Sequence, residues 1–163
     1  MNGFINTILV TVVSVGVITS SMMQGSAFYY DFDEEGKEVL ICEVMDLEED
    51  NNIEENIKYT LTYLFDNIND KYTFIPLGVN VSNILYINGS LYVEVSSDML
   101  NYGGNMRESA IVDQLLCTVF SFDEVNDFTL EIEGEREFLV EGTIINGYTR
   151  DKWNERMKLD NEN

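Results

Sequence analysis

Two adjacent glycines, Gly103 and Gly104, precede a segment with the pattern of a helix start. Such glycines can hold a phosphate, because the free N–H groups of a helix first turn attract an anion. They can also serve only to turn the chain, since glycine adopts positive φ without strain. A phosphate-binding loop carries a lysine after its glycines, whereas Asn105 follows here. The sequence therefore favours a structural turn, with Asn105 as the N-cap and Glu108 as its capping-box partner.

The charge of the chain limits its partners. Against 9 lysines and arginines stand 30 aspartates and glutamates, which gives a formal net charge of -21. A field of that sign repels nucleic acid, anionic lipid and phosphorylated ligands, so we expect no nucleic-acid partner. The chain contains no histidine, which excludes His-based triads, His-containing zinc sites and the usual proton shuttle. Any catalysis would have to rest on carboxylates.

One acidic stretch begins like a calcium-binding loop. Asp31, Asp33, Glu35 and Gly36 fall at its first, third, fifth and sixth positions. Cys42 stands at the twelfth position, where a bidentate glutamate is required. A solvated acidic hairpin turn is therefore the preferred interpretation.

Other carboxylates are spaced closely enough to suggest acid and base pairs. They are Asp123 with Glu124, and the run Glu131, Glu133, Glu135 and Glu137. Alternation along a strand places that run on an exposed face, where pKa values stay ordinary and general acid catalysis gains little. We therefore predict no enzyme activity, no cofactor and no metal site.

The two cysteines lie in apolar runs. Cys42 belongs to VLICEV and Cys117 to VDQLLCTVF. They could pair in an oxidising compartment, but small core residues occupy such positions too, and buried free thiols are the preferred interpretation.

The N-terminal segment has the features of an export signal. The run Phe4–Ile18 is apolar, no charged side chain occurs before residue 31, and Gly25-Ser26-Ala27 offers a small-x-small cleavage site. Residues 1–27 are thus predicted to be a signal peptide or, uncleaved, a membrane anchor, because Phe4–Met23 has about the 20 residues needed to cross a bilayer. We expect an extracytoplasmic protein.

Strand and helix patterns alternate after residue 27. SAFYYDF and KEVLICEV predict a hairpin, and residues 51–68 predict an amphipathic helix with Asn51 and Glu54 as its capping box. The apolar positions of this helix are Ile53, Ile57, Leu61, Leu64 and Ile68. A second helix follows Gly104, and DFTLEI alternates like a half-buried strand. The charged residues 151–163 predict a surface tail or a short terminal helix.

The segment NILYINGSLYVEV predicts a hairpin, because Asn88-Gly89 is the preferred pair for a two-residue type I′ turn. This turn places Leu85, Ile87 and Tyr92 on one face of the hairpin. The opposite face carries Ile84, Tyr86, Leu91, Val93 and Val95. We expect this second face beneath the helices, which leaves Leu85, Ile87 and Tyr92 as an apolar patch with a polar surround, the composition of a partner contact. Alternatively, the N-terminal hairpin or the C-terminal tail covers them.

These elements predict an α+β fold in which two helices pack on one face of a mostly antiparallel sheet of four or five strands. The predicted order is strand, strand, helix, strand, strand, helix, strand, strand. Two stretches then resemble a known family: IPLGVNVSNILYINGSLYVEVSSDMLNYGG and ESAIVDQLLCTVFSFDEVNDFTLEIEGE. With the order of elements, they resemble the GerM sporulation and spore germination domain, called GerMN, over residues 53–148.

The resemblance implies an extracytoplasmic, non-enzymatic module of spore-forming bacteria, similar in shape to ring-building domains of the sporulation channel. The implied partners are other extracytoplasmic sporulation or envelope proteins, with ring-forming channel components as candidates, and the membrane is contacted only through the N-terminal segment. One copy of the motifs predicts a single GerMN-like domain over residues 28–150, followed by the charged tail. The alternative function is an extracytoplasmic acidic binder of cations or cell-wall components, with an unrecognised hydrolase as a third class.

Overall fold

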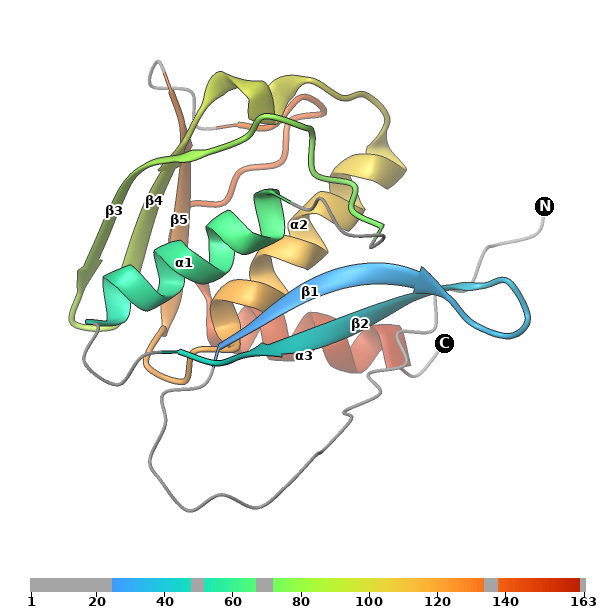
Figure 1. Ribbon diagram of the computed structural model, residues 1–163, viewed down its shortest axis with the longest axis horizontal. Coiled ribbons are helices and arrows are strands. Elements are labelled where there is room, and N and C mark those ends of the chain that lie inside the picture. Colours follow the sequence, from blue (N-terminus) through green and yellow to red (C-terminus); the bar gives the residue numbers. More distant parts are fainter. Residues whose placement is uncertain (1–24, 48–51, 67–71, 134–137, 162–163) are drawn as a thin grey trace.

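The computed structural model describes residues 25–47, 52–66, 72–133 and 138–161 (Figure 1). The elements are β1 (Gly25–Phe32), β2 (Glu38–Met45), α1 (Ile53–Phe65), β3 (Val81–Ile87), β4 (Ser90–Val95), a 3-10 helix (Ser97–Leu100), α2 (Asn105–Phe120), β5 (Asp127–Ile132), β6 (Tyr148–Thr149) and α3 (Arg150–Asn161). The predicted features outside these ranges are the run Phe4–Ile18, Asn51, Ile68, Glu135 and Glu137. None of the described helices is long and apolar enough to span a membrane.

The described strands form two sheets rather than the single sheet predicted. β1 and β2 pair as a hairpin, and the other sheet has the order β3-β4-β5-β6. In that sheet β4 and β5 are parallel, while the outer pairs are antiparallel. α2 connects β4 to β5, because parallel neighbours need a long crossover between them. The fold is α+β as predicted, but it has three helices in its described part and a mixed sheet.

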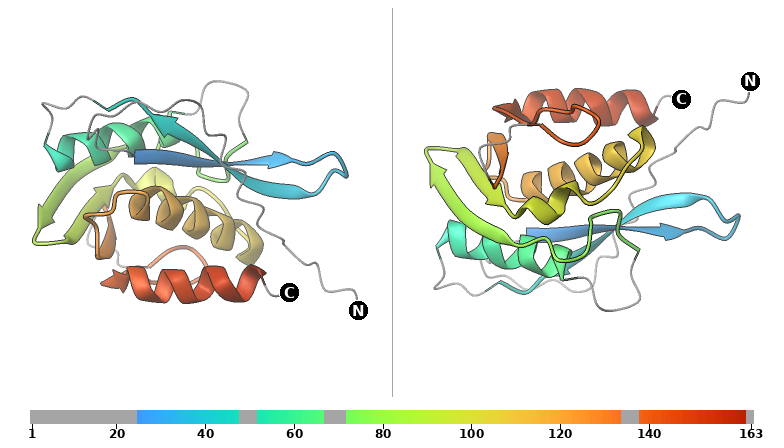
Figure 2. Two further views of the ribbon diagram at one scale, coloured as in Figure 1. Left: turned by 90° about the horizontal axis from the view of Figure 1, so that it is seen from below. Right: turned by 90° about the horizontal axis from the view of Figure 1, so that it is seen from above.

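The buried face of the four-stranded sheet lies against helices. Figure 2 shows α1 and α2 on the same side of this sheet. The side chains that point toward the helices and are buried are Leu91, Val93, Val95, Phe128, Leu130 and Ile132. The alternation predicted for DFTLEI therefore holds for its apolar residues, because period-two spacing sends them all to one face.

The α1 helix begins one residue later than predicted. Asn52 is its N-cap: the Asn52 side chain accepts from the Glu55 N–H at 2.9 Å, and the Glu55 carboxylate accepts from the Asn52 N–H at 3.3 Å. The predicted box of Asn51 with Glu54 is wrong, because Glu54 instead accepts a hydrogen bond from the Tyr86 N–H in β3 at 2.7 Å. Both registers satisfy the spacing rule, and a tertiary contact selects one of them.

The β1 strand contacts both α1 and α2. Its first residues are Gly25-Ser26-Ala27, the predicted cleavage site, and Ala27 is fully buried. The Ser26 N–H donates to the hydroxyl of Ser121 at 2.8 Å, and a Cβ on Gly25 would lie 2.3 Å from the ring of Phe122. The folded unit therefore begins at least three residues before the predicted boundary at 28.

The charged C-terminal segment forms the helix α3, which is the second of the two predicted alternatives. Its Trp153 is buried, and the Arg150 guanidinium donates to the carbonyl oxygens of Phe120, Phe122 and Val125. The Arg150 guanidinium also lies 5.2 Å from the centroid of the Phe120 ring. These carbonyls belong to the end of α2 and the turn after it, where a helix leaves acceptors without partners. A cation is favoured there, and it fixes α3 against α2.

Candidate functional site

The glycine pair before α2 is a turn in which only one glycine needs its conformational freedom. Gly104 has φ of 96° and is the N-cap of α2, whereas Gly103 is not in the positive-φ region. The prediction of Asn105 as N-cap is wrong, because Asn105 is already the first helical residue and no side chain caps the helix. Glycine takes the N-cap position because its backbone has a φ that asparagine would adopt only with strain.

Glu108 is buried with 2% of its surface exposed, and it does not form a capping box. Its carboxylate accepts hydrogen bonds from the Tyr102 hydroxyl at 2.7 Å, the Glu141 N–H at 2.6 Å and the Thr143 N–H at 3.0 Å. Burial raises the pKa of Glu108, but these hydrogen bonds outweigh it and lower the pKa below its usual range. Glu108 therefore holds the loop of residues 138–145 against α2 as an anion.

A second carboxylate occupies the turn itself. The Gly104 N–H donates to the Glu141 carboxylate at 2.7 Å. With Glu108 in the first turn, two carboxylates lie where a phosphate would have to bind, and like charges there are unfavourable. The Gly104 N–H therefore already has an acceptor within the chain, and the two carboxylates disfavour an anion at this turn.

The stretch that begins like a calcium loop is a hairpin turn. The Asp33 carboxylate accepts from the N–H groups of Glu35 at 2.9 Å and Lys37 at 2.8 Å, and Gly36 has φ of 76°. An aspartate that bonds to the backbone two residues on makes an Asx turn. Over the described residues, no group of three or more acidic or cysteine side chains is arranged to hold a metal ion.

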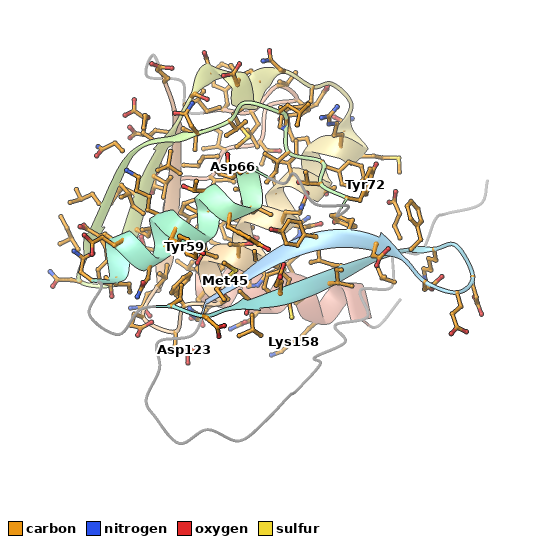
Figure 3. The ribbon with its side chains drawn as sticks, viewed as in Figure 1. Met45, Tyr59, Asp66, Tyr72, Asp123 and Lys158 are labelled. Atoms are coloured by element: carbon orange, nitrogen blue, oxygen red, sulfur yellow. The ribbon has the colours of Figure 1, made fainter. Side chains whose placement is uncertain are left out.

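The other candidates for chemistry are spread over the fold. Asp123 and Glu124 are exposed in the turn after α2 (Figure 3 labels Asp123), and the described members of the acidic run, Glu131 and Glu133, are exposed. Cys117 is a free, buried thiol whose pKa is raised by burial. Cys42 is also free and half-buried. These positions bring no acid, base and nucleophile together.

The β3-β4 hairpin places three apolar side chains in solvent. Asn88 and Gly89 have φ of 51° and 95°, as a type I′ turn requires, and Ile87 pairs with Ser90. The exposed fractions are 45% for Leu85, 50% for Ile87 and 42% for Tyr92. The described part of the chain, which includes the β1-β2 hairpin and α3, thus leaves these side chains exposed. We call Leu85, Ile87 and Tyr92 the sheet-face patch.

The acidic rim of this patch comes from neighbouring strands. In the register of β4 with β5, Ser90 faces Asp127 and Glu94 faces Glu131. Residues directly opposite on adjacent strands share a face of the sheet. The patch is therefore bordered by carboxylates on the side of β5.

A pocket of about 410 Å³ lies between β1, β2 and the first half of α2. From α2 it is lined by a single stripe at helical spacing, Met106, Ser109, Ala110 and Asp113. The other lining residues are Tyr30, Glu38 and Phe74. Sequence reasoning missed this pocket, because its walls come from segments that only the fold brings together.

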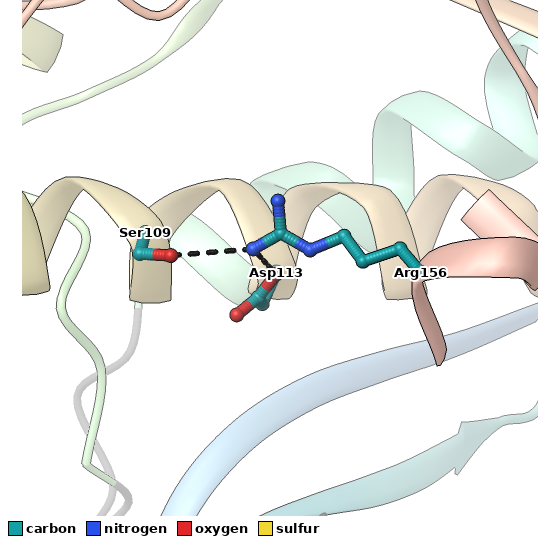
Figure 4. Close-up of polar contacts among 3 residues, drawn as sticks. All are labelled: Ser109, Asp113 and Arg156. Carbon is teal, nitrogen blue, oxygen red and sulfur yellow. Dashed lines mark hydrogen bonds and ion pairs between the residues drawn. The ribbon is translucent and has the colours of Figure 1, made fainter. Parts of the chain in front are cut away.

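Hydrogen bonds hold the walls of the pocket in place. The buried Gln114 side chain donates to the Phe28 carbonyl at 3.0 Å and accepts from the Phe74 N–H at 2.9 Å. On the rim, Arg156 of α3 forms an ion pair with Asp113 at 2.6 Å and donates to the Ser109 hydroxyl at 3.2 Å (Figure 4). These bonds fix β1, α3 and the loop at Phe74 relative to α2.

Comparisons with known proteins agree with this fold. The chain is similar to the first GerMN domain of the sporulation protein GerM from Bacillus subtilis, with 23% identity and a TM-score of 0.56 over 77% of this chain and 98% of that domain. It is similar to the tandem GerMN domains of the same protein with 22% identity and a TM-score of 0.56, over 78% of this chain but only 46% of that one.

A third similar structure is described as a lipoprotein from Clostridium perfringens, with 10% identity and a TM-score of 0.51 over 85% of this chain and 94% of that one. No match was found among curated proteins. Residues 24–138 match the sequence family described as Germane, sporulation and spore germination, which is more than half of the chain. The chain belongs to the Germane family of sporulation and spore germination domains.

Proposed function

We propose that this chain is an extracytoplasmic protein–protein interaction module that acts in sporulation or spore germination. The sheet-face patch is the observation that carries the proposal, because Leu85, Ile87 and Tyr92 stay exposed while the other face of the same hairpin is packed. A compact apolar and aromatic patch inside an acidic surface has the composition of a contact core with a polar rim. The partners we propose are other extracytoplasmic sporulation or envelope proteins, including ring-forming channel components.

The face of the sheet suits this role better than its edge. β3 is the outer strand of the sheet, but the Tyr86 N–H already donates to the Glu54 carboxylate of α1. An added strand needs free N–H groups along the edge, and a side chain that takes one of them disfavours strand addition. A partner would therefore lie across Leu85, Ile87 and Tyr92 rather than extend the sheet.

The substitution Tyr92→Glu tests the proposal. It places a charge in the centre of the patch, so we expect a tagged protein to lose its partner in a pull-down from sporulating cells. Its free energy of unfolding should change by no more than about 0.5 kcal/mol, as is usual for exposed positions.

Tyr59→Glu is the matched control, because Tyr59 is an exposed tyrosine on α1 (Figure 3). The substitution makes the same chemical change outside the sheet-face patch. We expect this variant to keep the partner. A stable Tyr92→Glu variant that still captures the partner would refute the sheet-face patch as the contact. A large loss of stability would show that Tyr92 belongs to the core.

A further inference from the structure

The pocket beside α2 has aromatic walls that continue to the surface. The Tyr30 and Phe74 rings lie 5.0 Å apart between centroids, and Phe74 and Tyr72 lie 4.7 Å apart, both edge to face. Tyr72 and Phe32 are exposed, and their rings are 6.0 Å apart. A cation near the face of such rings is attracted by their quadrupole, and an apolar stem packs against them.

The pocket also carries one carboxylate that the protein leaves available. Asp113 is paired with Arg156, so its charge is offset within the protein. The Glu38 side chain also lines the pocket, and by contrast its carboxylate has no hydrogen bond or ion pair with the described residues. The Tyr30 hydroxyl lies near both acids, and burial followed by their charges raises its pKa, which keeps the phenol neutral. The groups that line or border the pocket thus have a net charge near minus one.

These features select among ligand classes. The carboxylates and the net charge of -21 oppose an anion. A hydrated metal ion gains little from aromatic and aliphatic walls, because it needs several oxygen ligands. A single organic cation on an apolar stem matches both the free carboxylate and the Phe74, Met106 and Ala110 surfaces. Lysine and arginine side chains combine an apolar stem with a cationic end group in this way.

We propose that this pocket receives one basic side chain, lysine or arginine, from a partner polypeptide, with the cation at Glu38 and the stem along Phe74 and α2. Met106 is 78% exposed at the mouth, where it can close over the stem. The pocket shares no residue with the sheet-face patch. Figure 3 places Tyr72 toward the end of the molecule away from β3 and β4, so the two surfaces can be tested separately.

Titration of the 15N-labelled protein with Nα-acetyl-L-lysine methylamide, followed by amide chemical shifts, tests the proposal. We expect saturable shifts at Met106, Ser109 and Ala110. The same probe with an acetylated side-chain nitrogen has no charge and should produce no such shifts. Glu38→Gln should weaken the lysine probe about tenfold, the effect of losing a hydrogen bond to a charged group.

Two further variants make the result decisive. Glu34→Gln removes the same charge from the tip of the same hairpin, outside the pocket, and should leave binding unchanged. Met106→Lys puts a competing cation at the exposed mouth and should abolish binding without unfolding the protein.

Three results would overturn the proposal. The first is the absence of saturable shifts, and the second is equal binding of the uncharged probe, which would indicate a merely apolar cavity. The third is equal weakening by Glu38→Gln and Glu34→Gln, which would indicate general attraction to an acidic surface. Tyr92→Glu should bind the probe normally, so a failure here is distinct from a failure of the proposed function.

Discussion

Several carboxylates in this chain accept hydrogen bonds from backbone N–H groups. Asp33 does so in the β1-β2 turn, Glu54 at the edge of β3, Glu108 in the loop beside α2 and Glu141 at the N-cap of α2. Ionised acceptors form stronger hydrogen bonds than neutral ones. At the scale of single residues, acidic side chains therefore stabilise turns and termini here, which partly offsets the repulsion among 30 acidic residues.

The two glycines of the turn are expected to differ in their tolerance of a side chain. Gly104→Val places a β-branched residue at φ of 96° and should lower the free energy of unfolding by about 1 to 3 kcal/mol. Gly103→Val is the control, because no heavy atom lies within 4 Å of an added Cβ and φ is not positive; it should change stability by about 0.5 kcal/mol or less. Denaturant unfolding measures both. Equal losses would show that the turn does not depend on backbone conformation.

Glu108→Gln should destabilise the protein at neutral pH. The new side chain would replace one carboxylate oxygen by an amide nitrogen, so either the Thr143 N–H or both the Tyr102 hydroxyl and the Glu141 N–H lose their acceptor. We expect a loss of about 1 to 3 kcal/mol by denaturant unfolding at pH 7. The exposed Glu155→Gln serves as control and should be near neutral.

The pH dependence of that loss follows from the pKa of Glu108. The pKa of Glu108 is lower in the folded state than in the unfolded state. Its charge therefore contributes fully to the free energy of unfolding above the unfolded-state pKa of roughly 4.3, and this contribution disappears as the pH falls through the lower folded-state pKa. The difference between wild type and Glu108→Gln should therefore shrink on acidification. A stability difference that stays constant from pH 7 to about pH 3 would show that the charge of Glu108 does not stabilise the fold.

At the scale of elements, Arg150 is one of the residues that hold α3 against α2, together with the buried Trp153 and the ion-paired Arg156. Arg150 has a planar fork that reaches the carbonyls of Phe120, Phe122 and Val125 together and stacks on the Phe120 ring. Lysine has the charge but not the fork. Arg150→Lys should therefore cost about 1 to 3 kcal/mol in unfolding free energy and increase hydrogen exchange of α3 amides.

Lys152→Ala is the control for α3, because Lys152 is exposed on the same helix. It should leave both stability and exchange nearly unchanged. If Arg150→Lys behaves like this control, the hydrogen bonds to the end of α2 do not secure α3.

At the scale of the whole molecule, two proposed contact surfaces are separate. The sheet-face patch lies on β3 and β4, whereas the pocket lies between the β1-β2 hairpin and α2. Arg156, the ion-pair partner of the pocket residue Asp113, lies beyond the residues 24–138 matched by the family. Separate surfaces would allow one module to contact two partners, as an adaptor does.

The position of the mature N-terminus can be predicted from the fold. Cleavage after Ala27 would remove three residues of β1, including the Ser26 contact with Ser121 and the buried Ala27. If the protein is exported and processed, we expect N-terminal sequencing to give a start at or before Gly25. An intact Met1 in the membrane fraction would indicate an anchor. A start at Phe28, or an intact soluble cytoplasmic protein, would contradict this prediction.

Local sequence was enough to specify the features that depend on a few neighbouring residues. Asn88-Gly89 set the turn of the β3-β4 hairpin, and the two-residue period then assigned Leu85, Ile87 and Tyr92 to the exposed face. The helical spacing of apolar residues likewise predicted α1 and α2, and the alternation of apolar residues predicted β5. Turn chemistry and side-chain period act over short distances along the chain, so local patterns specify them.

The features that join distant segments depended on tertiary contacts. Gln114 links Phe74 and Phe28, which lie 40 and 86 residues away, and so holds Phe74 in the wall of the pocket, a contact that no spacing rule could reveal. The capping register of α1 was selected by Glu54 bonding to β3, and the helical state of the C-terminal segment by Arg150 at the end of α2. In each case the local patterns were compatible with more than one structure. The choice depended on the free energy of burying and pairing polar groups across the fold, which exists only once the segments meet.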